Sequence, residues 1–208
     1  MIRILGVLCL FFLAQSMAST SKIAETIDEI NPVLNGQSVP DVYVTNSSGD
    51  SLSLKRLVAK QKTILFFYRG GWCPFCNTQM GQLKEIEGQL AALGYQLIGI
   101  STDSVVMLNE SIKDKNLSYQ LLSDFHSEIS RAFGLAYFTS ANTTKRYLAA
   151  MNLKNPLKPN KAGEARLVLP APAIYVIDRD GLITFSYVNT NFKVRLDEQV
   201  LLSVAKHM

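Results

Sequence analysis

Apolar and polar residues follow one another along this chain in blocks whose spacing indicates both strands and helices. Residues 63–68 (TILFFY) are a continuous run of β-branched and aromatic side chains, the pattern of a strand buried on both faces. Apolar residues then recur every three or four positions from 80 to 93, as on the buried side of an amphipathic helix, and Gly94 stands where such a helix would stop. Residues 95–100 return to a strand pattern. This alternation predicts a sheet that is largely parallel in its middle.

The remaining blocks extend the alternation on both sides. Two short strands around the turn at 46–50 predict an N-terminal β-hairpin over residues 42–54. The pattern predicts further helices at 104–115, 128–133, 144–153 and 195–206, and further strands at 119–122, 173–177 and 182–188. The last two strands flank the turn Asp178-Arg179-Asp180-Gly181 and form a closing hairpin. In the final helix the spacing places four residues on the buried side: Leu196, Val200, Leu201 and Val204.

Residues 139–170 interrupt this regularity. Asn155-Pro156, Lys158-Pro159 and Gly163 break the pattern, and so long a connection is more often functional or mobile than part of a core. We therefore expect an α/β fold with a central mixed β-sheet flanked by helices, an N-terminal β-hairpin, and an insertion before the last hairpin.

The first eighteen residues differ from the rest. Arg3 precedes the apolar stretch 4–13, and Ser16-Met17-Ala18 offers small residues at the two positions that a signal peptidase reads. About ten apolar residues are too few for a spanning helix, which needs roughly twenty. The predicted organisation is a cleaved signal peptide at 1–18, an N-terminal arm at 19–35 and one domain at 36–208. We expect the protein to be exported, to the periplasm or outside the cell, with membrane contact only through the uncleaved signal segment.

Composition and charge narrow the choice of function only slightly. The 208 residues are 48% hydrophobic and 18% charged, enough for one domain with a sizeable core. The formal net charge is +4, and no block of five or more basic residues occurs. We therefore expect no nucleic-acid partner.

Two cysteines, Cys73 and Cys76, stand between the buried strand and the amphipathic helix. The unpaired N–H groups and partial positive charge of a helix N-terminus favour an anion, so the Cys73 thiol should ionise more easily than a free one. Pro74 suits the first helical position, where its missing N–H would have no partner. Cys76 lies one turn further along the same side, close enough for a disulfide with Cys73. The spacing predicts a pair that cycles between dithiol and disulfide.

A purely structural role for the pair is less favoured. A zinc site would need two more ligands, but Cys9 lies in the signal segment, and the only histidines are His126 and His207. A static disulfide that closes so small a loop would add little stability. We expect no metal and no cofactor.

Five groups of motifs carry a resemblance to a known family. They are Gly36-Gln37-Ser38-Val39-Pro40-Asp41; Phe67-Tyr68-Arg69-Gly70-Gly71-Trp72-Cys73-Pro74-Phe75-Cys76; Ile100-Ser101-Thr102-Asp103-Ser104; Leu122-Ser123-Asp124 with Arg131-Ala132-Phe133-Gly134; and Tyr175-Val176-Ile177-Asp178 with Asp180-Gly181. From about residue 36 to 188 the chain resembles the alkyl hydroperoxide reductase/thiol-specific antioxidant (AhpC/TSA) family, the peroxiredoxin-like branch of the thioredoxin superfamily. The resemblance implies a thioredoxin fold.

The site departs from the peroxidases of that family at two positions. Their peroxidatic cysteine corresponds to Cys76, but Cys73 stands where they carry a threonine. Pro172 stands where they carry an arginine, and Arg166 lies nearby only across an insertion.

The same two departures match the thioredoxin-like branch. Its motif is Trp-Cys-x-x-Cys, and a cis-proline faces the two cysteines. Trp72 begins that motif here, and Pro172 is the candidate for the cis-proline, with Pro170 as its competitor. The resemblance therefore favours thiol-disulfide exchange.

Three functions stay open at this point. In the first, an exported thiol-disulfide oxidoreductase, Cys73 attacks a substrate disulfide and Cys76 resolves the mixed disulfide. In the second, a thiol-dependent peroxiredoxin, Cys76 attacks a hydroperoxide and Cys73 condenses with the sulfenic acid. In the third, a non-catalytic module binds a partner protein through residues 139–170.

Supporting roles and partners follow from these hypotheses. Arg69 is expected near the thiolate, where it would favour the negative charge, and Trp72 is expected to be a packing and substrate-facing platform. Asp103 is a candidate cap for the helix that follows its strand. The expected partners are protein or small-molecule disulfides, or hydroperoxides, together with a thiol redox partner protein.

Overall fold

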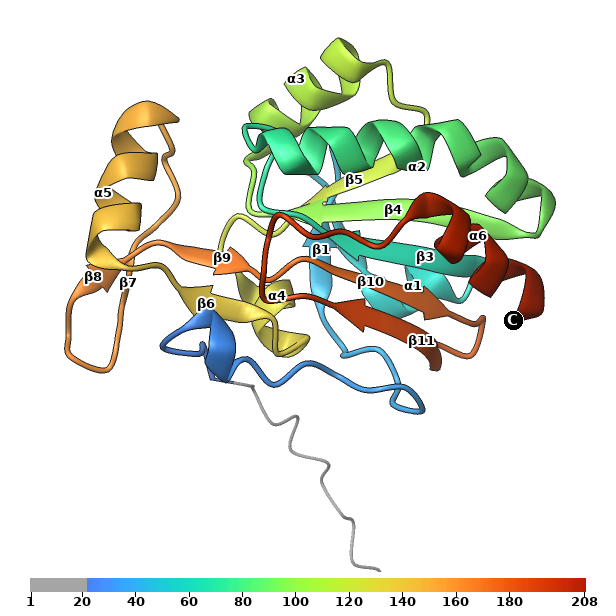
Figure 1. The fold of residues 1–208 in the computed structure, drawn as a ribbon, viewed down its shortest axis with the longest axis horizontal. Helices are drawn as coiled ribbons and strands as arrows, with labels where there is room; N and C mark the ends of the chain where they lie inside the picture. The colour runs from blue at the N-terminus through green and yellow to red at the C-terminus, as the bar shows by residue number, and fades with distance from the viewer. Residues whose placement is uncertain (1–21) are drawn as a thin grey trace, which may run out of the picture.

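The chain folds around one central sheet that carries the predicted active-site segment at its middle. The computed structural model describes residues 22–208, so the predicted signal peptide lies outside the described residues. Seven strands pair in the spatial order β11-β10-β3-β4-β5-β1-β2 (Figure 1). Their bounds are β1 Tyr43–Thr45, β2 Ser51–Ser53, β3 Lys62–Phe67, β4 Tyr95–Ser101, β5 Gln120–Ser123, β10 Ala173–Ile177 and β11 Ile183–Val188.

The strand directions confirm the predicted mixed sheet. β3 pairs with β4, and β4 with β5, in parallel, as expected for strands joined by crossover helices. The predicted hairpins β1-β2 and β10-β11 add antiparallel edges, because β1 pairs with β5 and β10 with β3. Five of the six residues of β3 are buried, which agrees with its uninterrupted apolar sequence.

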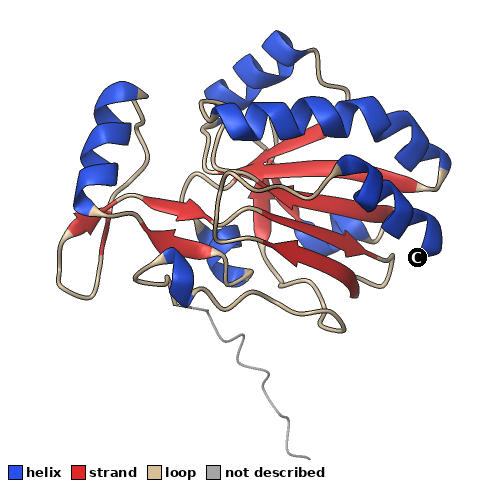
Figure 2. Cartoon of the chain, viewed as in Figure 1, coloured by secondary structure: helices blue, strands red, loops and turns tan. Residues whose placement is uncertain are grey.

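Helices cover both faces of the sheet (Figures 1 and 2). Their bounds are α1 Leu54–Val58, α2 Pro74–Ala92, α3 Val105–Lys115, α4 Glu128–Ala132, α5 Ala141–Ala150 and α6 Glu198–His207, preceded by a short 3-10 helix, η1, at Ile27–Glu29. Side chains of α2, α3 and α6 pack in one core on one face, and side chains of α1 and α4 pack in a second core on the other. The predicted stripe on α2 is confirmed, since Met80, Leu83, Ile86 and Leu90 are all buried.

The insertion forms a small layer of its own beside the sheet. It contains α5 and two short hairpin strands, β7 (Lys158–Pro159) and β8 (Ala165–Arg166). β9 (Val168–Pro170) pairs with β6 (Ala136–Phe138) in a second two-stranded sheet. Figure 1 shows α5, β7 and β8 set apart from the central sheet, with β6 and β9 between them. The insertion therefore contains regular secondary structure of its own.

The described part of the N-terminal arm is fastened to this layer. The backbone N–H of Ala24 donates to the carbonyl of Ala136 at 3.0 Å, and the N–H of Phe138 donates to the carbonyl of Ala24 at 2.9 Å. The arm therefore lies against β6, at the junction between the sheet and the insertion.

Two predicted helices begin at other residues than expected. α5 begins at Ala141 rather than at 144, because the Ser140 side chain caps it by accepting a hydrogen bond from the Thr143 N–H. α6 begins at Glu198 rather than at 195, because the Asp197 carboxylate accepts from the first backbone N–H groups of the helix. The phase of the last helix was also wrong at one position, since Val200 is 49% exposed. Among residues 22–208, no helix is long and apolar enough to cross a membrane.

Candidate active site

The two cysteines lie where β3 passes through a glycine loop into α2. Cys73 is the N-cap of α2, and its carbonyl accepts the first helical hydrogen bond, from the N–H of Asn77, at 3.0 Å. Pro74 is the first helical residue, as predicted. Both thiols are free and buried, so the structure describes the reduced dithiol. The predicted placement of Cys73 at a helix N-terminus is therefore confirmed.

The two thiols have opposite tendencies to ionise. The pKa of Cys73 is lowered to about 6, first by a hydrogen bond from the Cys76 thiol and further by the positive charges of Arg69 and Arg195. The pKa of Cys76 is raised, first by burial and then by the neighbouring Cys73. Near neutral pH the pair is therefore a Cys73 thiolate that accepts a hydrogen bond from a neutral Cys76.

Arg69 lies beside this pair, as predicted, but it is buried. Its side chain is 2% exposed, and its guanidinium carbon lies 5.2 Å from the ring centre of Trp72, 5.0 Å from that of Tyr147 and 4.2 Å from that of Phe192. Its Nε is buried without a hydrogen-bond partner. Aromatic faces attract a cation, so this arrangement holds the guanidinium without a carboxylate.

Trp72 connects the cysteine motif to the insertion. Its ring centre lies 5.2 Å from that of Tyr147 on α5, and it packs against the apolar cluster of the insertion. The predicted packing role of Trp72 agrees with these contacts.

Arg195 is a site residue that the sequence did not reveal. Because α6 begins only at Glu198, Arg195 lies in the loop before the helix, and its Nη2 donates to the Sγ of Cys76 at 3.4 Å. Its Nε and Nη1 are buried without partners. The only signal was Asp197, a good N-cap residue, which would have moved the start of the predicted helix to a position after this arginine.

Asp103 does not cap a helix, contrary to expectation, since the cap of α3 is Ser104. Its carboxylate instead accepts from the N–H of Gly71 at 2.7 Å, across the loop that carries the cysteines. Burial raises the pKa of Asp103 to about 6. This contact fixes the glycine loop to the end of β4.

Pro172 is not a cis-proline, because every peptide bond in residues 22–208 is trans; this excludes Pro170 as well. Pro172 is buried and leads directly into β10, whose first residue, Ala173, pairs with Phe67 at the end of β3. Its carbonyl accepts from the N–H of Asn189, so it continues the extended backbone of the closing hairpin. Pro172 therefore lies close to the site in the sheet, without the predicted geometry.

The other arginine that was considered, Arg166, lies in the hairpin of the insertion. Its Nη2 pairs with the carboxylate of Glu164 at 2.6 Å.

Among the residues that the structure describes, no group of three or more His, Cys, Asp or Glu side chains could hold a metal ion.

Comparisons with known proteins agree with this fold. The model of the AhpC/TSA family matches residues 35–186. A protein of Haemophilus influenzae named as a Bcp peroxiredoxin is 31% identical over 106 residues, which are 51% of this chain and 68% of that protein. The 1-Cys peroxiredoxin of Medicago truncatula is 24% identical over 160 residues, 74% of this chain and 63% of that protein.

Among solved structures, reduced Prx3 from Vibrio vulnificus superposes with a TM-score of 0.67 at 17% identity, covering 84% of this chain and 99% of that one. This likeness confirms the predicted thioredoxin-type fold. The family match covers most of the chain and includes both cysteines, which confirms the predicted enzyme class and argues against a non-catalytic module. This chain therefore belongs to the AhpC/TSA family, and it is a thiol-dependent oxidoreductase.

Proposed function

We propose that this protein reduces hydroperoxides through the Cys73/Cys76 pair, with Cys73 as the attacking thiolate. The observation that carries the proposal is the position of Cys73 as the N-cap of α2, where its pKa is lowered to about 6, while Cys76 is fully buried and its pKa is raised. The thiolate is the nucleophilic form of cysteine, so the attacking group is present at neutral pH. This assignment reverses the order of the two cysteines in the peroxidase alternative drawn from the sequence.

The reaction needs two steps at the site. The Cys73 thiolate attacks one oxygen of the hydroperoxide, and the O–O bond breaks. Cys73 becomes a sulfenic acid, and the leaving alkoxide takes a proton from water to give an alcohol. The Cys76 thiol then attacks the Cys73 sulfur, which forms the Cys73–Cys76 disulfide and releases water. Two electrons from an external dithiol restore the reduced pair.

The two arginines supply positive charge where negative charge develops. Arg195 donates to Cys76, and this hydrogen bond favours the thiolate that Cys76 becomes when it attacks the sulfenic acid. Arg69 favours the Cys73 thiolate before the first step. Fixed donors in a dry site stabilise such charge more strongly than water does.

Single-cysteine variants test which sulfur attacks. With Cys76→Ser, one equivalent of hydrogen peroxide should be consumed without turnover, and dimedone, which reacts with sulfenic acids, should label Cys73 as located by mass spectrometry. Cys73→Ser should consume none. The opposite result would identify Cys76 as the attacking cysteine. If the wild-type protein consumes no peroxide in the presence of dithiothreitol, the proposal is wrong.

Thiol-disulfide exchange is the second candidate, and one observation favours it. A low-pKa first cysteine followed by a buried second cysteine in a Cys-x-x-Cys motif is also suited to attack a disulfide. Reduction of insulin disulfides by dithiothreitol, catalysed by the wild type and abolished by Cys73→Ser, would support this activity. If peroxide reduction is the main activity, the rate constant for hydrogen peroxide should exceed that for insulin.

The electron donor and the cellular location also remain proposals. A thiol redox partner protein would reduce the Cys73–Cys76 disulfide, and the apolar segment at 4–13 supports export after cleavage at Ala18. The N-terminal sequence of the protein purified from its source cells tests the cleavage. Recovery of the uncleaved chain would contradict it.

A further inference from the structure

A cleft of about 370 Å3 opens beside the active site and is not used by the two-step reaction. Its walls come from the N-terminal arm, from β6, from the start of α5 and from the loop after β11. Arg69 lies in the wall shared with the cysteine motif, and Arg146 lies on the α5 side. The cleft therefore lies between the N-terminal arm, the insertion and Arg69, and neither cysteine lines it.

The positive charge in this cleft comes from two arginines. Neither Arg69 nor Arg146 forms an ion pair within residues 22–208. The two guanidinium carbons lie 5.0 and 5.2 Å from the ring centre of Tyr147. Arg69 is 2% exposed, and its Nε has no hydrogen-bond partner. A buried cation that holds an unused donor at the edge of a cleft is suited to bind an anion.

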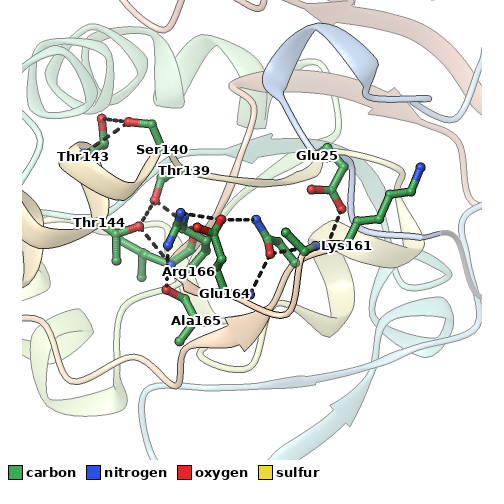
Figure 3. A network of polar contacts seen from close by, with 12 residues as sticks. Glu25, Thr139, Ser140, Thr143, Thr144, Lys161, Glu164, Ala165 and Arg166 are labelled. Carbon is green, nitrogen blue, oxygen red and sulfur yellow. Dashed lines mark hydrogen bonds and ion pairs between the residues drawn. The ribbon is translucent and has the colours of Figure 1, made fainter.

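The one carboxylate that lines the cleft is engaged elsewhere. Glu25 accepts a hydrogen bond from the backbone N–H of Lys161 in the β7-β8 hairpin, at 2.9 Å, and Figure 3 shows its carboxylate turned toward that residue. On the opposite side, Ser140 and Thr143 bond to each other at 3.0 Å, as drawn in Figure 3. Neither contact neutralises the arginines.

The rest of the lining is largely apolar. Ile27, Tyr137, Phe138 and Phe192 contribute side chains to the cleft, and the ring of Phe192 stacks on the Arg69 guanidinium. A ligand that fits must therefore combine an anionic group with a hydrocarbon portion.

We propose that this cleft binds the carboxylate of an amphipathic organic hydroperoxide, with the anion at Arg146 and Arg69 and the hydrocarbon chain against the aromatic rings. This inference rests on the proposed function for the reacting group only, because the cleft binds the acid whether or not it carries a peroxide. Binding of the carboxylate in the cleft should lower the KM of a carboxylate-bearing hydroperoxide relative to that of a neutral one of the same length.

The single tryptophan of the chain reports binding directly. Trp72 packs against Tyr147, so a ligand at Tyr147 should change its fluorescence. We expect decanoate, a stable carboxylate with no peroxide, to give a saturable change in the reduced wild-type protein, and 1-decanol, which has the same chain but no charge, to bind more weakly. Equal responses to both probes, or a response to neither, would overturn the proposal.

Charge variants on α5 locate the site. Arg146→Gln should raise the Kd for decanoate about threefold or more, the size expected for a partly exposed ion pair. Lys145→Gln is the matched control, because it removes the same charge from the neighbouring exposed position, and Lys145 does not line the cleft. If both variants weaken binding equally, the effect is general surface charge, and the assigned site is wrong.

A kinetic comparison separates this inference from the proposed function. The KM for a medium-chain hydroperoxy acid should be lower than that for its methyl ester, and Arg146→Gln should reduce the difference. Decanoate binding without turnover of either peroxide would refute the peroxidase activity and leave the cleft assignment standing. Equal KM values for acid and ester in an active enzyme would refute the cleft as a substrate site.

Discussion

The pKa of Cys73 depends first on the Cys76 thiol, and a substitution that removes this sulfur atom tests the dependence. The Cys76 thiol donates a hydrogen bond to the Cys73 sulfur, and this is the largest cause of the lowered pKa. Cys76→Ala deletes the donor, whereas Cys76→Ser keeps a hydroxyl donor of similar size. The two variants share the loss of the resolving thiol and differ in the hydrogen bond.

The size of the effect follows from the strength of that bond. A hydrogen bond to a charged group contributes about 1.5–3 kcal/mol, and about 1.4 kcal/mol corresponds to one pKa unit. Starting from a pKa of about 6, Cys76→Ala should therefore move the pKa of Cys73 up to about 7–8, while Cys76→Ser stays near the wild-type value. At pH 6.5 the thiolate fraction of the alanine variant should fall roughly 3- to 25-fold.

Alkylation by iodoacetamide measures this fraction, because only the thiolate reacts at an appreciable rate. Rates are recorded from about pH 5 to 9, and mass spectrometry assigns the label to Cys73. In wild type the rate should rise as pH increases through about 6, the direction required for a thiol whose ionised form is favoured. Coincident profiles for the alanine and serine variants, or a wild-type midpoint above about pH 8, would refute the reasoning.

Substitutions at three further residues test the surroundings of the pair. Arg195→Met should lower the rate of hydrogen peroxide reduction about tenfold or more, because it removes the donor to Cys76, and Arg195→Lys should recover part of the loss; an unchanged rate in Arg195→Met would exclude Arg195 from the chemistry. Gly70→Ala should reduce the free energy of unfolding by about 1–3 kcal/mol in urea, because Gly70 has φ +153° and an added Cβ would lie 2.1 Å from Trp72 Nε1. Burial raises the folded-state pKa of Asp103 to about 6, above the unfolded value near 4, so its contribution to stability is complete below about pH 4 and is lost as pH rises through about 6. The fall in stability between those limits, at most about 3 kcal/mol, should be smaller in Asp103→Asn, and equal pH profiles of the two proteins would contradict the assignment.

Local pattern was sufficient for the elements that build the sheet and place the cysteines. The apolar run at 63–68 is short and rich in β-branched and aromatic residues, which favours a buried strand, and the stripe on α2 has the period of a half-buried helix. Their junction placed Cys73 at the helix N-cap and Pro74 at the first helical position, and the structure has both there. These features depend on neighbouring residues only.

Arg69 was placed beside the thiolate from the sequence, but two other charged groups near the cysteines come from distant parts of the chain, and the sequence could not place them. Arg195 lies 119 residues from Cys76, and it contacts the sulfur only because Asp197 delays the start of α6. Asp103 resembled a helix cap until the loop of Gly71 was placed against it. The cis-proline prediction for Pro172 came from the resemblance alone, with no physical requirement in this chain, and it was wrong.

Reactivity and selectivity are therefore encoded in different parts of the chain. The Cys73 thiolate is favoured by the Cys76 thiol and by two arginines, and the contribution of residues 139–170 to these groups is the Tyr147 ring that packs on Arg69. The cleft, in contrast, has α5 and β6 as walls, so changes in the insertion can alter which peroxide approaches without altering the sulfur that attacks it.

Arg69 belongs to both parts, because the same guanidinium favours the thiolate and lines the cleft. An anion bound at Arg69 would offset part of the positive charge that stabilises the Cys73 thiolate. Saturating decanoate should therefore slow the alkylation of Cys73 more near pH 6 than near pH 8. The reason is that ionisation of Cys73 is incomplete near pH 6 and nearly complete near pH 8. An equal slowing at both pH values would mean that the acid only blocks access to the sulfur.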